Sequence, residues 1–186
     1  MKRPFAGTLS DLERVLIDSG TIQKRVAELA AEIQNDFRGQ VLSVVALMDG
    51  ALFFVADLLR HLELPVQLHT LTVSSYHGGI TSSGRVQLAR QLPFTLKTRH
   101  VLLIDDILDT GLTLSNVQQR LQDEFRPEVF QTAVLLDKQR PRSLDVKCKY
   151  TGFKIEDEFV VGYGMDYQGH YRNLPCIGVL NPDHLS

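Results

Sequence analysis

The chain alternates between short apolar runs and longer segments in which apolar residues recur every three or four positions. Three apolar runs predict buried strands: 41–47, 101–104 and 130–136. Residues 65–73, rich in Val, Leu and Thr, predict a further strand. Three segments show the helical spacing: 21–33, 51–62 and 114–125. Strands separated by helices predict an α/β fold, with a mainly parallel twisted sheet and helices on both of its faces.

The first forty residues predict two helices. Ser10-Asp11-Leu12-Glu13 fits a capping box that opens a short helix, and Ser19-Gly20 would end that helix. Thr21 can cap a second helix that continues to Gly39. The inward positions of the second helix follow the helical period: Ile22, Val26, Leu29, Ala30 and Ile33.

The stretch from Val101 to Leu114 is the most informative part of the chain. An apolar strand leads into Asp105-Asp106-Ile107-Leu108-Asp109, and Thr110-Gly111-Leu112-Thr113 then opens a helix. Backbone N–H groups at such a helix start bind anions, two hydroxyls can donate to a phosphate, and glycine lets the backbone come close. Asp105 and Asp106 suit sugar hydroxyls or Mg²⁺, and Asp109 is placed to exchange a proton. Together these residues predict a site for a phosphorylated sugar.

Two other loops are predicted to serve the same edge of the sheet. Met48-Asp49-Gly50 follows the strand at 41–47 and offers a second set of backbone amides for an anion. Residues 74–85 are small and polar with three glycines, which is typical of a mobile lid or of an exposed hairpin tip. Residues 86–88 would return from this loop as a strand.

Two further segments predict a pocket for a flat ring. Lys138 follows the strand at 130–136 and would point toward Asp109, although a solvated loop charge is the alternative. Phe159 begins a strand and turn over 159–167. An aromatic ring and an ammonium group that converge on one pocket can stack on a ring and donate to its oxo group.

Composition excludes several classes of function. The 186 residues, 44% hydrophobic and 23% charged, predict one globular domain over 1–186. The net charge of −2 provides no basic field for nucleic acid, and no apolar run predicts a membrane span or a secretion signal, so we expect a cytoplasmic protein. Cys148 and Cys176 lack a metal-ligand spacing, and the six histidines form no helical pair, so a zinc site is not expected.

The acids and the Asp109-Thr110-Gly111-Leu112-Thr113 run resemble the phosphoribosyl pyrophosphate signature of type I phosphoribosyltransferases. From Val41 to Val179 the chain resembles hypoxanthine-guanine phosphoribosyltransferases more closely, above all in Phe-Val-Val-Gly-Tyr-x-x-Asp-Tyr. The resemblance implies a single-domain type I fold, with a core at about 41–180 and a small hood from the N-terminal and C-terminal segments.

The same resemblance implies roles for individual residues. Asp105, Asp106 and residues 109–113 would bind the ribose 5-phosphate, and Asp109 would be the general base. Asp49, Gly50 and Arg172 would meet the pyrophosphate. Asp105, Asp106 and Asp166 would hold Mg²⁺.

The base pocket and the lid also have counterparts in that family. Lys138 would contact the 6-oxo group, Phe159 would stack on the purine, and the Val160 backbone would meet the base edge. Ser75 and Tyr76 match the pair that opens the flexible catalytic loop.

Two positions depart from the family pattern. Asp49 stands where relatives commonly have Lys, so we expect the backbone amides to meet the pyrophosphate while the carboxylate turns away. Leu112 stands where relatives often carry Lys or another polar residue.

The activity implied is purine salvage: phosphoribosyl pyrophosphate and hypoxanthine, and also guanine, would give the nucleoside monophosphate and pyrophosphate with Mg²⁺. Relatives form dimers or tetramers, so a homo-oligomer is expected. One alternative is a transferase for xanthine or another base. A second is a regulator that senses phosphoribosyl pyrophosphate and binds RNA or DNA, against which stand the absent basic stripe and the intact Asp109 and Lys138.

Overall fold

The computed structural model describes residues 7–75, 86–87, 92–142, 144 and 146–184. Among these residues, five strands form one parallel sheet in the order β3-β2-β6-β7-β8. Their bounds are β2 Leu42–Met48, β3 Val66–Thr72, β6 His100–Leu108, β7 Val129–Lys138 and β8 Tyr150–Ile155. The predicted α/β fold with a parallel sheet is therefore confirmed.

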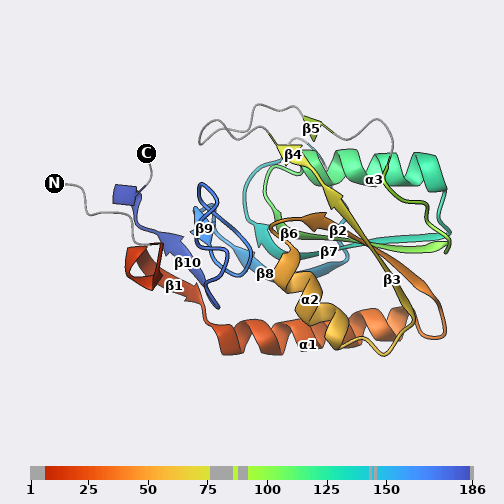
Figure 1. Ribbon diagram of the computed structural model, residues 1–186, viewed down its shortest axis with the longest axis horizontal. Coiled ribbons are helices and arrows are strands. Elements are labelled where there is room, and N and C mark those ends of the chain that lie inside the picture. The colour runs from red at the N-terminus through yellow and green to blue at the C-terminus, as the bar shows by residue number, and fades with distance from the viewer. Residues whose placement is uncertain (1–6, 76–85, 88–91, 143, 145, 185–186) are drawn as a thin grey trace.

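Helices cover both faces of this sheet (Figure 1). Helices α1 (Ser19–Asp36) and α2 (Leu52–Arg60) pack on one face, and α3 (Leu112–Phe125) packs on the other. Successive residues of β2 alternate between the two cores, since Val44 packs with α1 and α2 while Val45 packs with α3. Because both faces of β2 are buried, this strand reads in the sequence as a continuous apolar run.

A second, smaller sheet joins the two ends of the chain. It consists of β1 (Leu12–Ile17), β10 (Ile177–Leu180) and β9 (Val160–Val161), paired antiparallel in that order. We call it the small sheet; it lies at the left of Figure 1, where the termini also lie. The N-terminal and C-terminal segments thus build one structure together. That this structure is a hood separate from a core at about 41–180 stays a prediction.

The predicted N-terminal helix is wrong. A short 3-10 turn, η1 (Leu9–Asp11), leads directly into β1 at Leu12. The Asp11 carboxylate accepts from the backbone N–H of Gly7 at 2.8 Å, so Asp11 acts in the turn before the strand rather than in a new helix. Pairing of Leu12 with Leu180 then fixes the strand, and such tertiary pairing overrides the local helical signal.

The second predicted helix is confirmed, with different ends. Helix α1 starts at Ser19, and Asp18 is its N-cap because its carboxylate accepts from the Thr21 N–H at 3.0 Å. The helix ends at Asp36, before Gly39, which has a φ of +76°. All five inward positions expected from the period are buried.

The remaining elements are short. Strand β4 (Ser74–Ser75) pairs antiparallel with β5 (Val86–Gln87), so the expected return strand begins at Val86. A 3-10 turn, η2 (Pro182–His184), follows β10. No helix in the described part of the chain is both long and apolar enough to span a membrane.

Candidate functional site

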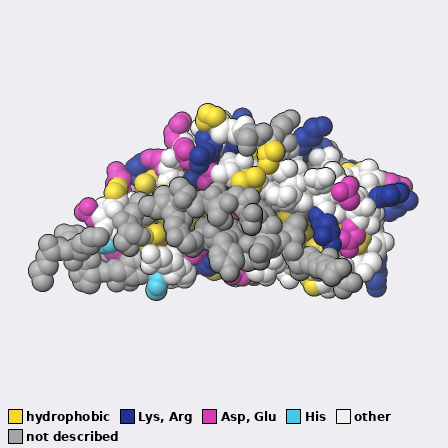
Figure 2. Space-filling view, turned by 90° about the horizontal axis from the view of Figure 1, so that it is seen from above, with side chains coloured by type: hydrophobic (Ala, Val, Ile, Leu, Met, Phe, Trp, Pro, Cys, Tyr) yellow, Lys and Arg dark blue, Asp and Glu magenta, His cyan; other side chains and the backbone are white. Residues whose placement is uncertain are grey.

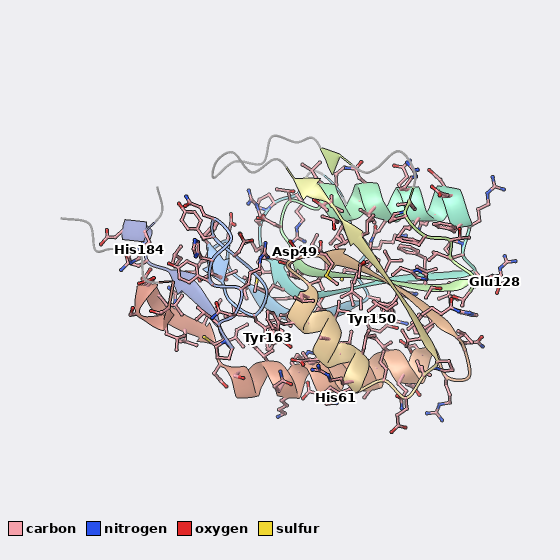
Figure 3. The ribbon with its side chains drawn as sticks, in the orientation of Figure 1. Asp49, His61, Glu128, Tyr150, Tyr163 and His184 are labelled. Carbon is pink, nitrogen blue, oxygen red and sulfur yellow. The ribbon has the colours of Figure 1, made fainter. Side chains whose placement is uncertain are left out.

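The candidate site lies at the carboxyl edge of the parallel sheet. In Figure 3, Asp49 marks this edge just after β2, and Glu128 marks the opposite edge just before β7. Strand β6 extends farther than the apolar run predicts, since the acids belong to the strand and the strand ends at Leu108. Ligand sites of open α/β sheets form outside this edge of the strands, where the connecting loops begin.

Asp105 and Asp106 form a carboxylate pair at the end of β6, in which Asp105 is buried and Asp106 is half-buried. Asp105 is 8% exposed, and its carboxylate accepts from the Asp106 N–H at 3.0 Å. Burial raises the pKa of Asp105 well above its usual range, and the neighbouring charge of Asp106 raises it further. Burial also raises the pKa of Asp106, although the charge of Arg172 opposes that shift.

This pair fits a Mg²⁺ site. No group of three or more His, Cys, Asp or Glu side chains suited to a metal gathers among the described residues. Mg²⁺ is usually held by one or two carboxylates together with water and substrate phosphates, so these two adjacent carboxylates are a sufficient protein contribution. A cation beside Asp105 and Asp106 would also compensate charge that burial disfavours.

Gly50 is held between Asp106 and the turn that follows β9. A Cβ added at Gly50 would lie 2.2 Å from Oδ2 of Asp106, so the carboxylate lies directly against this loop. On the other side, a Cβ added at Gly164 would lie 2.0 Å from the carbonyl oxygen of Gly50. Glycine is required at both positions because backbone and carboxylate come this close.

Arg172 and Asp166 meet beside the same glycines. Arg172 donates from Nη1 to the Gly164 carbonyl at 2.6 Å, and its Nη2 lies 2.8 Å from Oδ1 of Asp166. The Asp166 carboxylate also accepts from the Gly169 N–H at 2.7 Å. The residues that the sequence assigns to pyrophosphate and metal are thus brought together, while their roles stay predictions.

Asp49 is exposed, and the direction of its carboxylate stays a prediction. Its carbonyl accepts from the Leu52 N–H at 3.2 Å, which closes the turn into α2. Ser75 lies in β4, and Tyr76, the other predicted lid residue, lies outside the described residues.

Helix α3 begins where the phosphate motif predicts. Gly111 is its N-cap with a φ of +82°, and the Leu112 N–H donates to Oγ1 of Thr110 at 3.4 Å. A Cβ at Gly111 would also lie 2.8 Å from Cγ2 of Val146. Residues 110–113 therefore present the first backbone N–H groups of α3 at the carboxyl edge.

Asp109 lies among three further charged side chains. Nζ of Lys138 lies 3.2 Å from one carboxylate oxygen of Asp109 and 3.5 Å from Asp157, and Nη1 of Arg140 lies 2.9 Å from Asp109 and 3.4 Å from Asp157. Two cations and two anions thus alternate around one centre. The Lys138 side chain is 10% exposed, so it is not the solvated loop charge that was its alternative.

Arg142 ties the ends of β6 and β7 together. Its guanidinium donates to the carbonyls of Asp109 at 2.8 Å and Leu108 at 3.0 Å. It also donates to the Lys138 carbonyl and pairs with the carboxylate of Asp137. Arg142 is not among the site residues that the sequence predicts.

The predicted ring-stacking residue stands at the start of the small sheet. Phe159 packs edge-on against Tyr167, with ring centroids 5.6 Å apart. Val160 is buried in β9 and pairs with Val179. Asp157, two residues before Phe159, links this segment to Lys138, so the aromatic and the ammonium group belong to adjoining parts of one edge.

The face seen in Figure 2 carries Lys and Arg interspersed with Asp and Glu among its described residues.

Comparison with known proteins identifies close relatives over nearly the whole chain. A family model described as the phosphoribosyl transferase domain matches residues 16–168. A curated hypoxanthine-guanine phosphoribosyltransferase of Staphylococcus aureus is 41% identical over 174 residues, which cover 94% of this chain and 97% of the relative.

Solved structures agree with the sequence relatives. A hypoxanthine phosphoribosyltransferase from Staphylococcus aureus superposes with a TM-score of 0.86 at 40% identity, covering 95% of this chain and 96% of that one. A hypoxanthine-guanine phosphoribosyltransferase from Bacillus anthracis gives 0.82 at 35% identity, covering 91% and 99%.

Proposed function

The chain belongs to the phosphoribosyltransferase family, and on that premise we propose that it transfers the 5-phosphoribosyl group from phosphoribosyl pyrophosphate to hypoxanthine and guanine. The products are the nucleoside monophosphate and pyrophosphate, as in purine salvage. The observation that carries the proposal is the ion pair between buried Lys138 and Asp109 at 3.2 Å, at the mouth of the phosphate motif. This pair supplies a donor for a 6-oxo group beside a carboxylate that can take a ring proton.

The phosphoribosyl half of the substrate binds along the loop from β6 to α3. The N–H groups at residues 110–113 and the hydroxyls of Thr110 and Thr113 bind the 5-phosphate, helped by the positive end of α3. A phosphate held by backbone donors does not require a charge at Leu112. Asp105 and Asp106 accept hydrogen bonds from the ribose hydroxyls.

The pyrophosphate half faces the loop at Asp49 and Gly50, and Arg172 provides the positive charge there. Asp105, Asp106 and Asp166 would hold Mg²⁺, which when bound neutralises charge that accumulates on the leaving pyrophosphate. Asp49 is exposed, and its carboxylate would repel the pyrophosphate, so the Gly50 backbone makes the contact. Departure of pyrophosphate leaves positive charge on the ribose carbon and negative charge on the pyrophosphate. Hydrogen-bond donors that the protein holds against the pyrophosphate stabilise that negative charge and so favour its departure.

Binding of the purine replaces the ion pair between Lys138 and Asp109 with a contact from each residue to the base. When the purine enters, Lys138 turns from Asp109 to the 6-oxo group, and the Oδ2 oxygen that it releases can accept the imidazole-ring proton while Arg140 stays paired with Oδ1. Phe159 stacks on the ring, and the Val160 backbone meets its edge. Ser75 and Tyr76 open the loop that we assign to excluding water during the reaction. A cytoplasmic homodimer or homotetramer completes the proposal.

Parallel assays with four bases test the proposed function. Hypoxanthine, guanine, xanthine and adenine are each offered with phosphoribosyl pyrophosphate and Mg²⁺, and nucleotide formation is followed. We expect turnover of hypoxanthine and guanine and none of adenine, which presents an amino donor where Lys138 requires an acceptor. Turnover of xanthine alone would reassign the base, and absence of turnover with all four would reject the proposal.

A further inference from the structure

Tyr163 joins the turn after β9 to helix α2. Its side chain is buried, and its hydroxyl donates to Oδ2 of Asp57 at 2.6 Å. Gln23 Nε2 at 2.7 Å and Arg60 Nη1 at 3.0 Å donate to the same carboxylate and fix its orientation. Burial and the adjacent Asp57 raise the pKa of Tyr163 far above its usual range, so the hydroxyl keeps the proton that it donates.

The backbone beside Tyr163 is bound directly to the segment that carries Arg172. The Tyr163 N–H donates to the Leu174 carbonyl at 2.8 Å, and the Gly164 N–H donates to the Arg172 carbonyl at 2.9 Å. Arg172 returns a hydrogen bond from its side chain to the Gly164 carbonyl. Tyr163, Gly164 and Arg172 are therefore joined into one hydrogen-bonded unit.

This unit faces the loop that leads into α2. Gly164 packs on the Gly50 carbonyl, and Asp57 lies on α2, which starts at Leu52. The ring of Phe53 in the first turn of α2 also packs near Tyr163, with centroids 6.2 Å apart. The same two segments are thus joined twice, at the glycines and at the Tyr163 hydroxyl.

We propose that the Tyr163–Asp57 hydrogen bond is a latch that sets the distance between Arg172 and the pyrophosphate loop at Gly50. Tyr163 is then a positioning residue, and it acts on the pyrophosphate end of the substrate rather than on the base. The inference rests on the proposed function, because that function assigns Gly50, Asp166 and Arg172 to pyrophosphate. Groups held in the reactive geometry before the substrate arrives bind more tightly than groups that must be ordered on binding.

The chain offers a matched control in Tyr150. Its side chain is also buried, its hydroxyl donates to Oδ2 of Asp36 at 2.7 Å, and burial with Asp36 raises its pKa in the same way. This bond joins β8 to α1, neither of which carries a residue that we assign to the substrate. In Figure 3, Tyr150 lies toward the Glu128 end of the molecule, and Tyr163 lies toward the small sheet. Loss of either hydroxyl therefore removes one buried tyrosine–aspartate hydrogen bond, but only the loss at Tyr163 should affect substrate binding.

The test compares Tyr163→Phe and Tyr150→Phe with the wild type. Tyr163→Phe should raise both the KM for phosphoribosyl pyrophosphate and the inhibition constant of pyrophosphate by about three- to tenfold, the worth of one buried hydrogen bond. The KM for hypoxanthine should not change. Tyr150→Phe should lower the melting temperature by about as much as Tyr163→Phe does, and it should leave both KM values and the inhibition constant at wild-type values. Asp57→Asn tests the acceptor side and should shift the constants in the same direction as Tyr163→Phe.

The outcomes separate the latch from the proposed function. Unchanged constants in Tyr163→Phe, or an equal rise for both substrates, would overturn the latch, as would the same shifts in Tyr150→Phe. Calorimetric binding of phosphoribosyl pyrophosphate gives a second reading that needs no turnover. A wild type that binds this substrate but turns over no base rejects the proposed function, while equal affinity in Tyr163→Phe and wild type rejects the latch. A wild type that does not bind it rejects both.

Discussion

Replacing Gly164 with Ala tests how closely the small sheet and the pyrophosphate loop must pack. The added Cβ would lie 2.0 Å from the Gly50 carbonyl oxygen, whereas side-chain carbons essentially never approach within 3.0 Å. The two segments must therefore separate by about 1 Å, the difference between those two distances. Because the obstacle is backbone on both sides, no side-chain rotation can relieve the overlap.

Two costs follow from the substitution. The left-handed backbone at Gly164, with a φ of +104°, adds strain of roughly 1–2 kcal/mol for any residue with a Cβ. Displacing catalytic groups by 1 Å can lower rates by about 10²-fold. We therefore expect kcat/KM for phosphoribosyl pyrophosphate to fall by about 10²-fold, because Arg172 and Asp166 move away from Gly50.

Gly169→Ala provides the control for backbone strain. Gly169 has a φ of +82°, and a Cβ there would meet nothing within 4 Å, so this substitution adds strain without overlap. The assay measures kcat/KM at varied phosphoribosyl pyrophosphate, together with the melting temperature of each variant. If Gly164→Ala kept the kcat/KM of Gly169→Ala, the close packing would have no role in substrate binding and the reasoning would fail.

Three further predictions concern the base site and the pH dependence of stability. Asp109→Asn should lower kcat by about 10²- to 10⁴-fold, because an amide cannot accept the ring proton, and an unchanged kcat in steady-state assays would remove the general-base role. Lys138→Met should raise the KM for hypoxanthine by about 10- to 100-fold while the KM for phosphoribosyl pyrophosphate stays near wild type, and equal rises in both would refute a base-specific contact. Burial lowers the pKa of His69, whose ring packs against that of Phe94 with the two centroids 4.9 Å apart. As the pH falls below 6.5, His69 binds a proton more readily in the unfolded chain than in the folded chain, so the melting temperature should decline. His69→Phe should weaken that decline. His61→Asn, at an exposed histidine, should leave the decline unchanged.

The parallel core could be predicted because burial on both faces leaves a direct trace in the sequence. Strands β2, β6 and β7 read as apolar runs, and the helices between them show their period. Strand β8 leaves no such trace, since Gly152 and Lys154 interrupt it. A Cβ at Gly152 would lie 2.4 Å from the Leu135 carbonyl oxygen. Glycine is needed at this position because β8 packs closely on β7, and not because the chain turns there.

The site could be predicted where it depends on strand ends. Asp109 and Lys138 each follow a buried strand, and adjacent parallel strands end at the same edge, so their approach follows from the pattern. The contacts of Arg140 with Asp157 depend on how two loops fold back, and no periodic signal encodes that geometry. Strand β1 was missed for a similar reason, because its partner Leu180 lies at the other end of the chain.

The most direct test of the account is the stoichiometry of the reaction. With phosphoribosyl pyrophosphate, Mg²⁺ and hypoxanthine, chromatography measures the inosine monophosphate formed, and a coupled assay measures the pyrophosphate released. The account predicts that the two products appear in equal amounts and that neither appears when hypoxanthine is omitted. Pyrophosphate released at the same rate without the base would contradict it, because the carboxyl edge would then catalyse hydrolysis rather than transfer to a purine held by Lys138 and Asp109.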